Sequence, residues 1–264
     1  MDQKEKQALI DAASETAIKE VARVLQIAPT RESVRPAMEL AMGSELMKLY
    51  KLCVYFAVEA DRFFEQKTFF ASCLFTVAAS EAFLALICFH EQDSVRSTKA
   101  FRGLNKQSKT FSDVIADFSL DKLIKVSSEL GWIPVDVVNA RLLDAIVTDF
   151  PKLAKTVYPN WDQSKIEGKI EAFRSSPGPE LLKVMQDMRN LVHAPRWLKT
   201  GSILDGVEFE ENCKLAVLAG REVVQCLSIK TTKAFDEALQ RLAPFDQLPA
   251  DVKGRVSELL LRDI

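Results

Sequence analysis

The sequence is poor in the residues that interrupt helices. Glycine occurs 9 times and proline 10 times in 264 residues. Because these two residues are the strongest punctuators of local structure, their scarcity favours long helices joined by short connections. The sequence contains no strand-like alternation longer than four residues and no internal repeat. It therefore predicts an all-α fold, a helical bundle.

Several motifs of known chemistry are also missing. The sequence contains no glycine-rich phosphate loop, no H-E-x-x-H and no G-x-S-x-G. Its five cysteines form no C-x-x-C pair, and their odd number and wide spacing indicate neither a disulfide framework nor a zinc site. They are Cys53, Cys73, Cys88, Cys213 and Cys226. We interpret them as buried thiols in a reducing cytosol, and we expect a cytoplasmic protein without metal or cofactor.

Charges of the two signs nearly balance, with a net charge of −2 and a pI of about 5.9. Since no overall basic field attracts nucleic acid, binding of RNA requires a local patch. The stretch 94–109 is the candidate, because it is mostly polar and has no acidic residue. Its cations are Arg96, Lys99, Arg102, Lys106 and Lys109. We expect a loop or a loosely held helix there, and a merely solvated basic loop is the alternative to a phosphate-binding patch.

Two segments bear on targeting. The charged stretch 1–7 lacks an apolar core, so we expect no signal peptide. The apolar run 69–89 is as long as a membrane-spanning helix. Glu81 lies near its middle, at a cost of roughly 2.5–3.5 kcal/mol for membrane insertion. We therefore interpret the run as a fully buried central helix and expect no membrane association. A membrane protein is a distant alternative, tested by solubility without detergent.

Apolar residues at helical spacing predict a succession of helices. The expected ranges are 4–26, 32–64, 68–90, two short helices within 111–131, 134–157, 162–174, 179–193, 209–229, 231–242 and 250–262. Gly131 is expected to end the short helices, Pro134 to begin the next helix, and Pro151 to bend or split it. The predicted domains are N-terminal helices over 1–66 that pack on the core, a bundle over 67–230, and a C-terminal helical extension over 231–264.

The segment 184–195 holds the residues best suited to chemistry. Arg189 and His193 lie four residues apart, so on a helix they lie about 40° from each other. Arginine grips phosphate with two hydrogen bonds, and histidine moves protons near neutral pH. RNA cleavage needs both, because the 2′-hydroxyl loses a proton, the leaving 5′-oxygen gains one, and the phosphorane must be stabilised. The alternative is that both side chains merely complement the dipole and free carbonyls of a helix end.

The loop 195–207, directly after this segment, contains Arg196, Trp197 and Lys199. These residues are able to offer charge and stacking to single-stranded RNA. Trp197 is equally suited to capping the bundle. His90 ends a buried helix next to Glu91, where a capping role is expected rather than a catalytic one.

The stretch 188–194, Met-Arg-Asn-Leu-Val-His-Ala, resembles the signature of the HEPN superfamily, in which an arginine, often followed by asparagine, precedes a histidine near a helix end. The apolar helix over 69–89 is similar to the first core helix of such bundles, many of which have a glutamate where Glu81 stands. The stretch 120–134, which ends in Leu-Gly-Trp-Ile-Pro, resembles their second helical element. The order of these parts also fits, and the resemblance covers about 68–229.

The resemblance implies a HEPN-like helical bundle, and some members of that superfamily are metal-independent endoribonucleases of toxin or defence type. Arg189 and His193 match the catalytic pair of that family, and Asn190 matches the polar residue that follows the arginine. Active members are usually homodimers that bring two such pairs into one cleft. The implied partners are therefore RNA, a second copy of the chain, and a protein partner or antitoxin.

The spacing departs from the family signature, which has four to six residues between arginine and histidine where this sequence has three. On a regular helix, one residue fewer turns the two side chains by about 100° relative to each other. Two hypotheses follow: an endoribonuclease, or a non-catalytic HEPN-like bundle that binds RNA, a nucleotide or a protein. A helical scaffold without a nucleic-acid role is a third, allowed by the near-neutral charge and by the helices at 4–64 and 231–262 that lie outside the resemblance.

Overall fold

The computed structural model describes residues 31–102, 110–191 and 206–241. Within these ranges the chain forms ten helices and no strand, which confirms the predicted all-α fold. The chain divides into two compact units, residues 52–230 on the one hand and residues 1–51 with 231–264 on the other. Helices α2 (Arg31–Glu65) and α12 (Gly206–Arg241) contribute residues to both units. The predicted site residues that the structure describes, Arg96, Lys99, Arg102, Arg189 and Asn190, fall within the unit 52–230.

Helix α3 (Phe69–His90) is the central helix of this unit. It is apolar around its circumference, and a helix of this kind must be buried. Its buried hydroxyls are satisfied by backbone carbonyls, since the Ser72 Oγ donates to Ala60 O at 2.6 Å and the Ser80 Oγ donates to Thr76 O at 2.9 Å. The helix is long and apolar enough to cross a membrane, but 67% of its most apolar window is buried inside the protein. It therefore occupies the place of a core helix, but it is not fully buried as was predicted.

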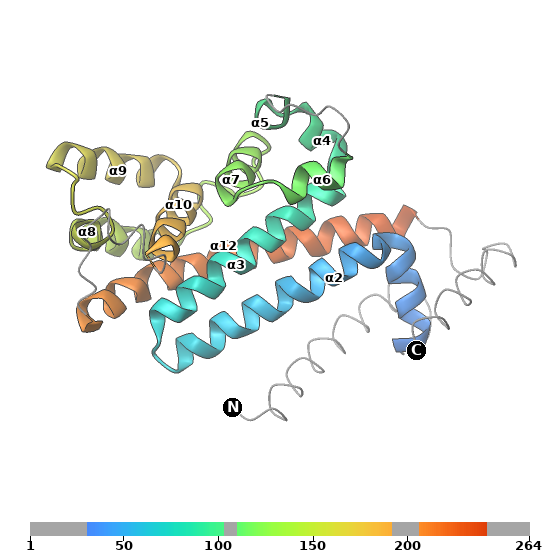
Figure 1. Ribbon diagram of the computed structural model, residues 1–264, viewed down its shortest axis with the longest axis horizontal. Helices are drawn as coiled ribbons and strands as arrows, with labels where there is room; N and C mark the ends of the chain where they lie inside the picture. The colour runs from blue at the N-terminus through green and yellow to red at the C-terminus, as the bar shows by residue number, and fades with distance from the viewer. Residues whose placement is uncertain (1–30, 103–109, 192–205, 242–264) are drawn as a thin grey trace, which may run out of the picture. The chain divides into compact units, whose positions relative to one another are not determined.

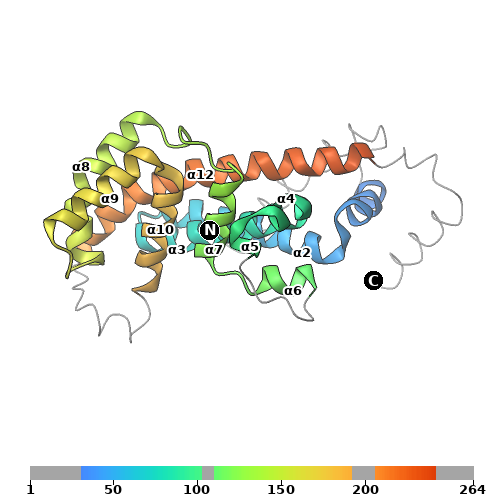
Figure 2. The ribbon, with the colours of Figure 1, turned by 90° about the horizontal axis from the view of Figure 1, so that it is seen from above.

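The shorter helices lie in two groups along α3 (Figures 1 and 2). One group gathers at its C-terminal end and comprises α4 (Gln92–Ser97), α5 (Lys99–Arg102), α6 (Phe111–Ala116) and α7 (Leu120–Glu129). The other group comprises α8 (Ala140–Val157), α9 (Gln163–Ser175) and α10 (Pro177–Asn190). Helix α10 packs directly on α3 and also contacts α7, α8 and α9. It therefore joins the second group to the core.

Local capping explains where several helices begin. Thr110 and Asp113 form a capping box at the start of α6, and the Asp162 carboxylate accepts a hydrogen bond from Lys165 N at the start of α9. The two short helices predicted within 111–131 are confirmed as α6 and α7. Gly131 follows them with a φ of 64°, a backbone conformation that glycine adopts without strain. The predicted stop at this residue is confirmed.

The helix predicted from Pro134 begins only at Ala140, so its predicted start is wrong. The Asn139 side chain caps it by accepting a hydrogen bond from Arg141 N at 2.9 Å. The stretch 133–139 is not helical. Its backbone forms turns, and the buried side chains of Ile133 and Val138 attach it to the core. Pro151 lies inside α8 without splitting it into two elements.

Two other helix boundaries were predicted wrongly. Helix α10 begins at Pro177, where a loop was expected, because proline is tolerated in a first turn whose N–H groups have no helical partner. Helix α12 runs without interruption from Gly206 to Arg241, whereas two helices with a break at residue 230 were expected. No glycine or proline stands between residues 221 and 241 to end it. The helices predicted over 4–26 and 250–262 lie outside the described residues.

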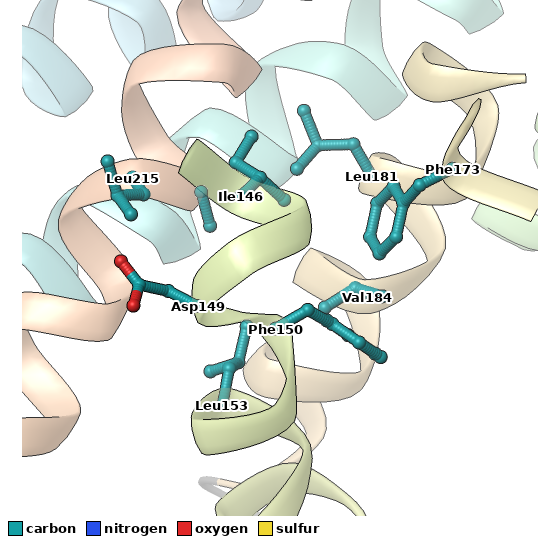
Figure 3. A pocket seen from close by; sticks show the side chains of 9 residues that line it. Ile146, Asp149, Phe150, Leu153, Phe173, Leu181, Val184 and Leu215 are labelled. Carbon is teal, nitrogen blue, oxygen red and sulfur yellow. The ribbon is translucent and has the colours of Figure 1, made fainter. Parts of the chain in front are cut away.

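Helices α8, α9, α10 and α12 enclose a cavity of about 20 Å³, which is near the volume that one water molecule occupies (Figure 3). Phe150 and Phe173 pack edge to face at its wall, with ring centroids 5.2 Å apart. Leu181 and Val184 of α10 line the same space. The cavity is part of the core that positions α10 and is too small for a ligand.

Candidate functional site

The C-terminal turn of α10 presents the predicted arginine to α3. Arg189 is the penultimate residue of α10, and its Nη1 lies 2.8 Å from Oε2 of Glu81 on α3. The two residues are 108 positions apart in the sequence. Met185 and Met188 anchor this turn, since both side chains are fully buried. The position of the guanidinium is therefore set by the packing of α10 on α3.

The ion pair lies at the edge of the bundle, with side chains 29% exposed for Arg189 and 33% exposed for Glu81. A guanidinium has five N–H donors in a planar fork, and the contact with Glu81 uses Nη1. The glutamate also neutralises the arginine. The site can thus position a guanidinium for a phosphate, but it does not by itself create a strong positive field.

Cys73, whose thiol senses the charge of Arg189, is not a second reactive group. Cys73 of α3 is fully buried, and burial raises the pKa of its thiol to about 12 although the charge of Arg189 opposes this rise. Because the thiolate is the nucleophilic form of cysteine, this thiol is inert at neutral pH. Cys53 and Cys88 have pKa values raised to about 12 by burial as well, and burial also raises the pKa of Cys213.

Asn190 is half-buried at the last position of α10. It lies about 100° around the helix from Arg189, on the side of α10 that faces away from the buried stripe. His193 lies outside the described residues, as do Arg196, Trp197 and Lys199. The structure therefore brings together Arg189 and Glu81, with Asn190 on a different side of α10, and the pairing of Arg189 with His193 remains a prediction.

The predicted basic stretch is partly helical and is tied to α7. The Glu129 carboxylate accepts hydrogen bonds from Lys99 N at 2.7 Å and Ala100 N at 3.0 Å, which caps the start of α5. Arg96, Lys99 and Arg102 are exposed, and the Arg96 guanidinium also lies 4.9 Å from the centroid of the Phe111 ring. Lys106 and Lys109 lie outside the described residues.

The basic stretch is not adjacent to Arg189. Glu81, which marks the position of Arg189, precedes the C-terminal end of α3 at His90 by nine residues. At about 1.5 Å per residue, this separation amounts to roughly 14 Å along the helix. Helices α4 and α5 begin only beyond that end. The two sites are therefore separate surfaces that only an extended ligand reaches together.

His90 shows a feature that the sequence did not suggest. Its Nε2 atom is buried and has no hydrogen-bond partner in the part of the chain that the structure describes. Burial lowers the pKa of this imidazole, against the opposing charge of Glu91. Glu91 itself is engaged by Lys230 Nζ at 2.8 Å and by Trp132 Nε1 at 3.0 Å. A capping role for the His90 side chain remains a prediction.

A groove of about 330 Å³ lies between α2, α3 and α12 on the unit 52–230. Its wall consists mainly of small and apolar side chains, among them Ala57, Ala79 and Phe83. Its charged groups are Arg221 and Asp61, which form an ion pair at 2.9 Å. Because these two charges neutralise each other, the groove does not fit a phosphate.

Two aromatic residues near α10 were missed as site candidates. Tyr158 and Trp161 stack on each other in the turn between α8 and α9, and the Tyr158 hydroxyl lies 2.7 Å from Oδ2 of Asp187 on α10. The sequence indicated the turn through Pro159 and Asn160 but not the contact with α10. Aromatic residues on both sides of a proline turn were the available signal.

No family model matches this chain, and neither a curated protein nor a solved structure matches it.

Proposed function

We propose that this chain is a HEPN-like protein that acts on RNA as a metal-independent endoribonuclease, with Arg189 and His193 as its reactive pair. The observation that supports the proposal most directly is the contact between Arg189 and Glu81. Two of the three segments that carry the resemblance are far apart in the sequence, the apolar helix with its central glutamate and the helix end with its arginine. A chance similarity in either segment gives no reason for these two side chains to meet at 2.8 Å.

The spacing between Arg189 and His193 is a departure from the family signature that weighs against catalysis. Helix α10 ends at Asn190, with Leu191 as its C-cap, and His193 lies outside the described residues. The cleavage assay below therefore decides whether a chain with this spacing cuts RNA.

In the proposed reaction, His193 removes the proton from a ribose 2′-hydroxyl, and the 2′-oxygen forms a bond to the adjacent phosphorus while the bond from phosphorus to the 5′-oxygen breaks. The leaving 5′-oxygen takes a proton, from the partner subunit's histidine in a homodimer or from water. Arg189 donates hydrogen bonds to the phosphorane oxygens as their charge develops. Glu81 holds the guanidinium in place. The products are a 2′,3′-cyclic phosphate and a 5′-hydroxyl.

The test is cleavage of a single-stranded RNA by the purified full chain in the presence of EDTA. Arg189→Ala and His193→Ala should each lower the rate about 100-fold or more, the usual effect of removing one transition-state donor or proton-transfer group. Lys230→Ala is the matched control, because it removes a cation from an ion pair of the same length elsewhere on the unit. A DNA strand of the same sequence should resist cleavage. Equal rates for the parent and both site variants would eliminate the proposal.

The second candidate is a HEPN-like bundle that binds RNA without cutting it. It is favoured by the neutralisation of Arg189 by Glu81, together with the exposed cations Arg96, Lys99 and Arg102. The same protein preparations separate the two ideas. Saturable RNA binding that is lost when these three cations are changed to glutamate, with no cleavage by the parent, would support the non-catalytic bundle.

A further inference from the structure

The turn between α8 and α9 holds two aromatic rings in a fixed stack. The backbone N–H of Trp161 donates to Tyr158 O at 2.9 Å, which closes the turn. The two rings lie nearly parallel, with an interplanar angle of 8° and centroids 3.8 Å apart. Both residues are half-buried, so neither ring is enclosed by the core. The turn thus presents a rigid aromatic surface at the edge of the unit.

A hydrogen bond attaches this stack to α10. The Tyr158 hydroxyl lies 2.7 Å from Oδ2 of Asp187, two residues before Arg189. On α10, Asn190 lies about 60° from Asp187 and about 100° from Arg189, on the half of the helix opposite the buried stripe. Asn190 is therefore flanked by the arginine on the side of α3 and by the aromatic stack on the side of α8 and α9.

The separation suits a short stretch of nucleic acid. An α-helix is about 10–12 Å across with its side chains, so the arginine and the aromatic stack lie on the two flanks of one helix end. A nucleotide bound with its phosphate at Arg189 places a neighbouring base within reach of the stack. Trp161 has no hydrogen bond from its indole N–H to any residue that the structure describes, so this donor is available to the ligand.

We infer that Tyr158 and Trp161 form a stacking subsite for an unpaired base of single-stranded RNA held at Arg189. Every base has a π-face, so a platform of this kind binds without strong sequence preference. This inference rests on the proposed function, because it assigns a place to the same RNA. The competing explanation is that the two rings only close the turn between α8 and α9.

The experiment measures the affinity of the full chain, in a His193→Ala background that prevents cleavage, for two probes of equal length. One probe is an unstructured oligouridine, and the other is the same ribose-phosphate chain without bases. The parent should bind oligouridine about 5- to 100-fold more tightly than the abasic chain, the range expected for stacking of one base. Trp161→Ala should lower the affinity for oligouridine to that for the abasic chain and leave the abasic affinity unchanged.

Matched variants separate stacking from folding. Trp161→Phe should retain most of the preference for bases, and Trp132→Phe, which changes a buried indole, should retain all of it. If Trp161→Ala does not fold, tryptophan fluorescence in a Trp197→Phe background, which removes the third tryptophan of the chain, gives the answer. In that background oligouridine should quench the emission of the protein and of its Trp132→Phe variant, and should quench the Trp161→Phe variant much less. A Trp161→Ala protein that melts like the parent and binds both probes as the parent does would overturn the inference.

The failure of the inference differs from the failure of the proposed function. Arg189→Ala should weaken binding of both probes, because it removes a phosphate contact common to them. If it does so while Trp161→Ala has no effect, RNA binding at Arg189 stands and the stacking subsite falls. If the parent binds neither probe, both ideas fall.

Discussion

Helix α3 has two ion pairs that look alike by the usual measures. One joins Glu81 in the middle of the helix to Arg189, and the other joins Glu91 directly after the helix to Lys230, each at 2.8 Å. The side chains are 29% and 33% exposed in the first pair and 30% and 28% exposed in the second. Neither distance nor burial therefore distinguishes a functional pair from a structural one.

The two pairs differ in what surrounds them. At the Glu91 end, the second carboxylate oxygen accepts a hydrogen bond from the buried Trp132 indole, and the Lys230 ammonium lies 5.8 Å from the centroid of the same ring. That pair is built into the packing of an aromatic side chain. At the Glu81 end, the cation is a guanidinium with several donors, next to Asn190 on the outer side of α10. A partly exposed pair contributes little to stability, so we expect the difference between the two pairs to lie in their surroundings.

The largest effect on stability should come from Trp132, the aromatic residue that contacts the Glu91–Lys230 pair and has no counterpart at the Glu81–Arg189 pair. Trp132→Ala removes a side chain that is 3% exposed and should lower the free energy of unfolding by about 3–5 kcal/mol. Arg189→Ala should change it by about 1 kcal/mol at most. Urea unfolding followed by circular dichroism measures both. A loss below about 1 kcal/mol for Trp132→Ala would show that the two ends are held in the same way.

Replacing Glu81 or Glu91 by glutamine compares the two ion pairs by their effect on RNA cleavage. Glu81→Gln should lower the rate of RNA cleavage by about tenfold, because the guanidinium loses the partner that orients it. RNA affinity should stay the same or increase, because the arginine is no longer neutralised. Glu91→Gln is the matched control and should change neither quantity. Equal rates for Glu81→Gln and the parent under single-turnover conditions would exclude a positioning role for Glu81.

Protonation of His90, next to Glu91, should lower the stability of the protein at acidic pH. Burial lowers the pKa of this imidazole in the folded state, so the unfolded chain, with a pKa near 6.5, binds the proton first. The free energy of unfolding should therefore decrease as the pH falls from about 7 towards 5. His90→Gln should reduce this decrease, whereas Arg189→Ala should not. Urea midpoints of all three proteins at both pH values test this, and the same decrease in His90→Gln as in the parent would contradict it.

The smallest effect should be the coupling between Lys230 and Glu91. Exposed ion pairs measured by double-mutant cycles contribute about 0.2–1 kcal/mol, and salt reduces this further. A cycle of Lys230→Ala and Glu91→Gln should give a coupling energy in this range. A coupling energy well above that range, unchanged in 0.5 M salt, would mean that the pair is effectively buried.

Periodicity predicted the long helices well, because apolar spacing and the scarcity of glycine and proline are local properties of the sequence. It failed where local signals competed. Pro134 suggested a helix start, but the Asn139 cap decides it, and Pro177 suggested a loop but begins α10. In α12, separate helices over 209–229 and 231–242 were predicted, but without a glycine or proline between residues 221 and 241 the helix continues.

The candidate site was only half predictable. Arg189 and Asn190 were chosen from a short local motif. The partner of Arg189 is 108 positions away, and a single sequence does not reveal such a contact. The link between Tyr158 and Asp187 was missed for the same reason, since it joins the turn after α8 to a different helix.

The buried cysteines allow the separation of the helices to be followed by thiol labelling. Cys53, Cys73, Cys88 and Cys213 have no exposed surface, and Cys226 is only half-buried. A thiol reagent therefore reaches the first four only when helices separate, and the order in which they become labelled gives the order in which the bundle comes apart. Labelling with and without RNA would show which helices a bound strand holds closed.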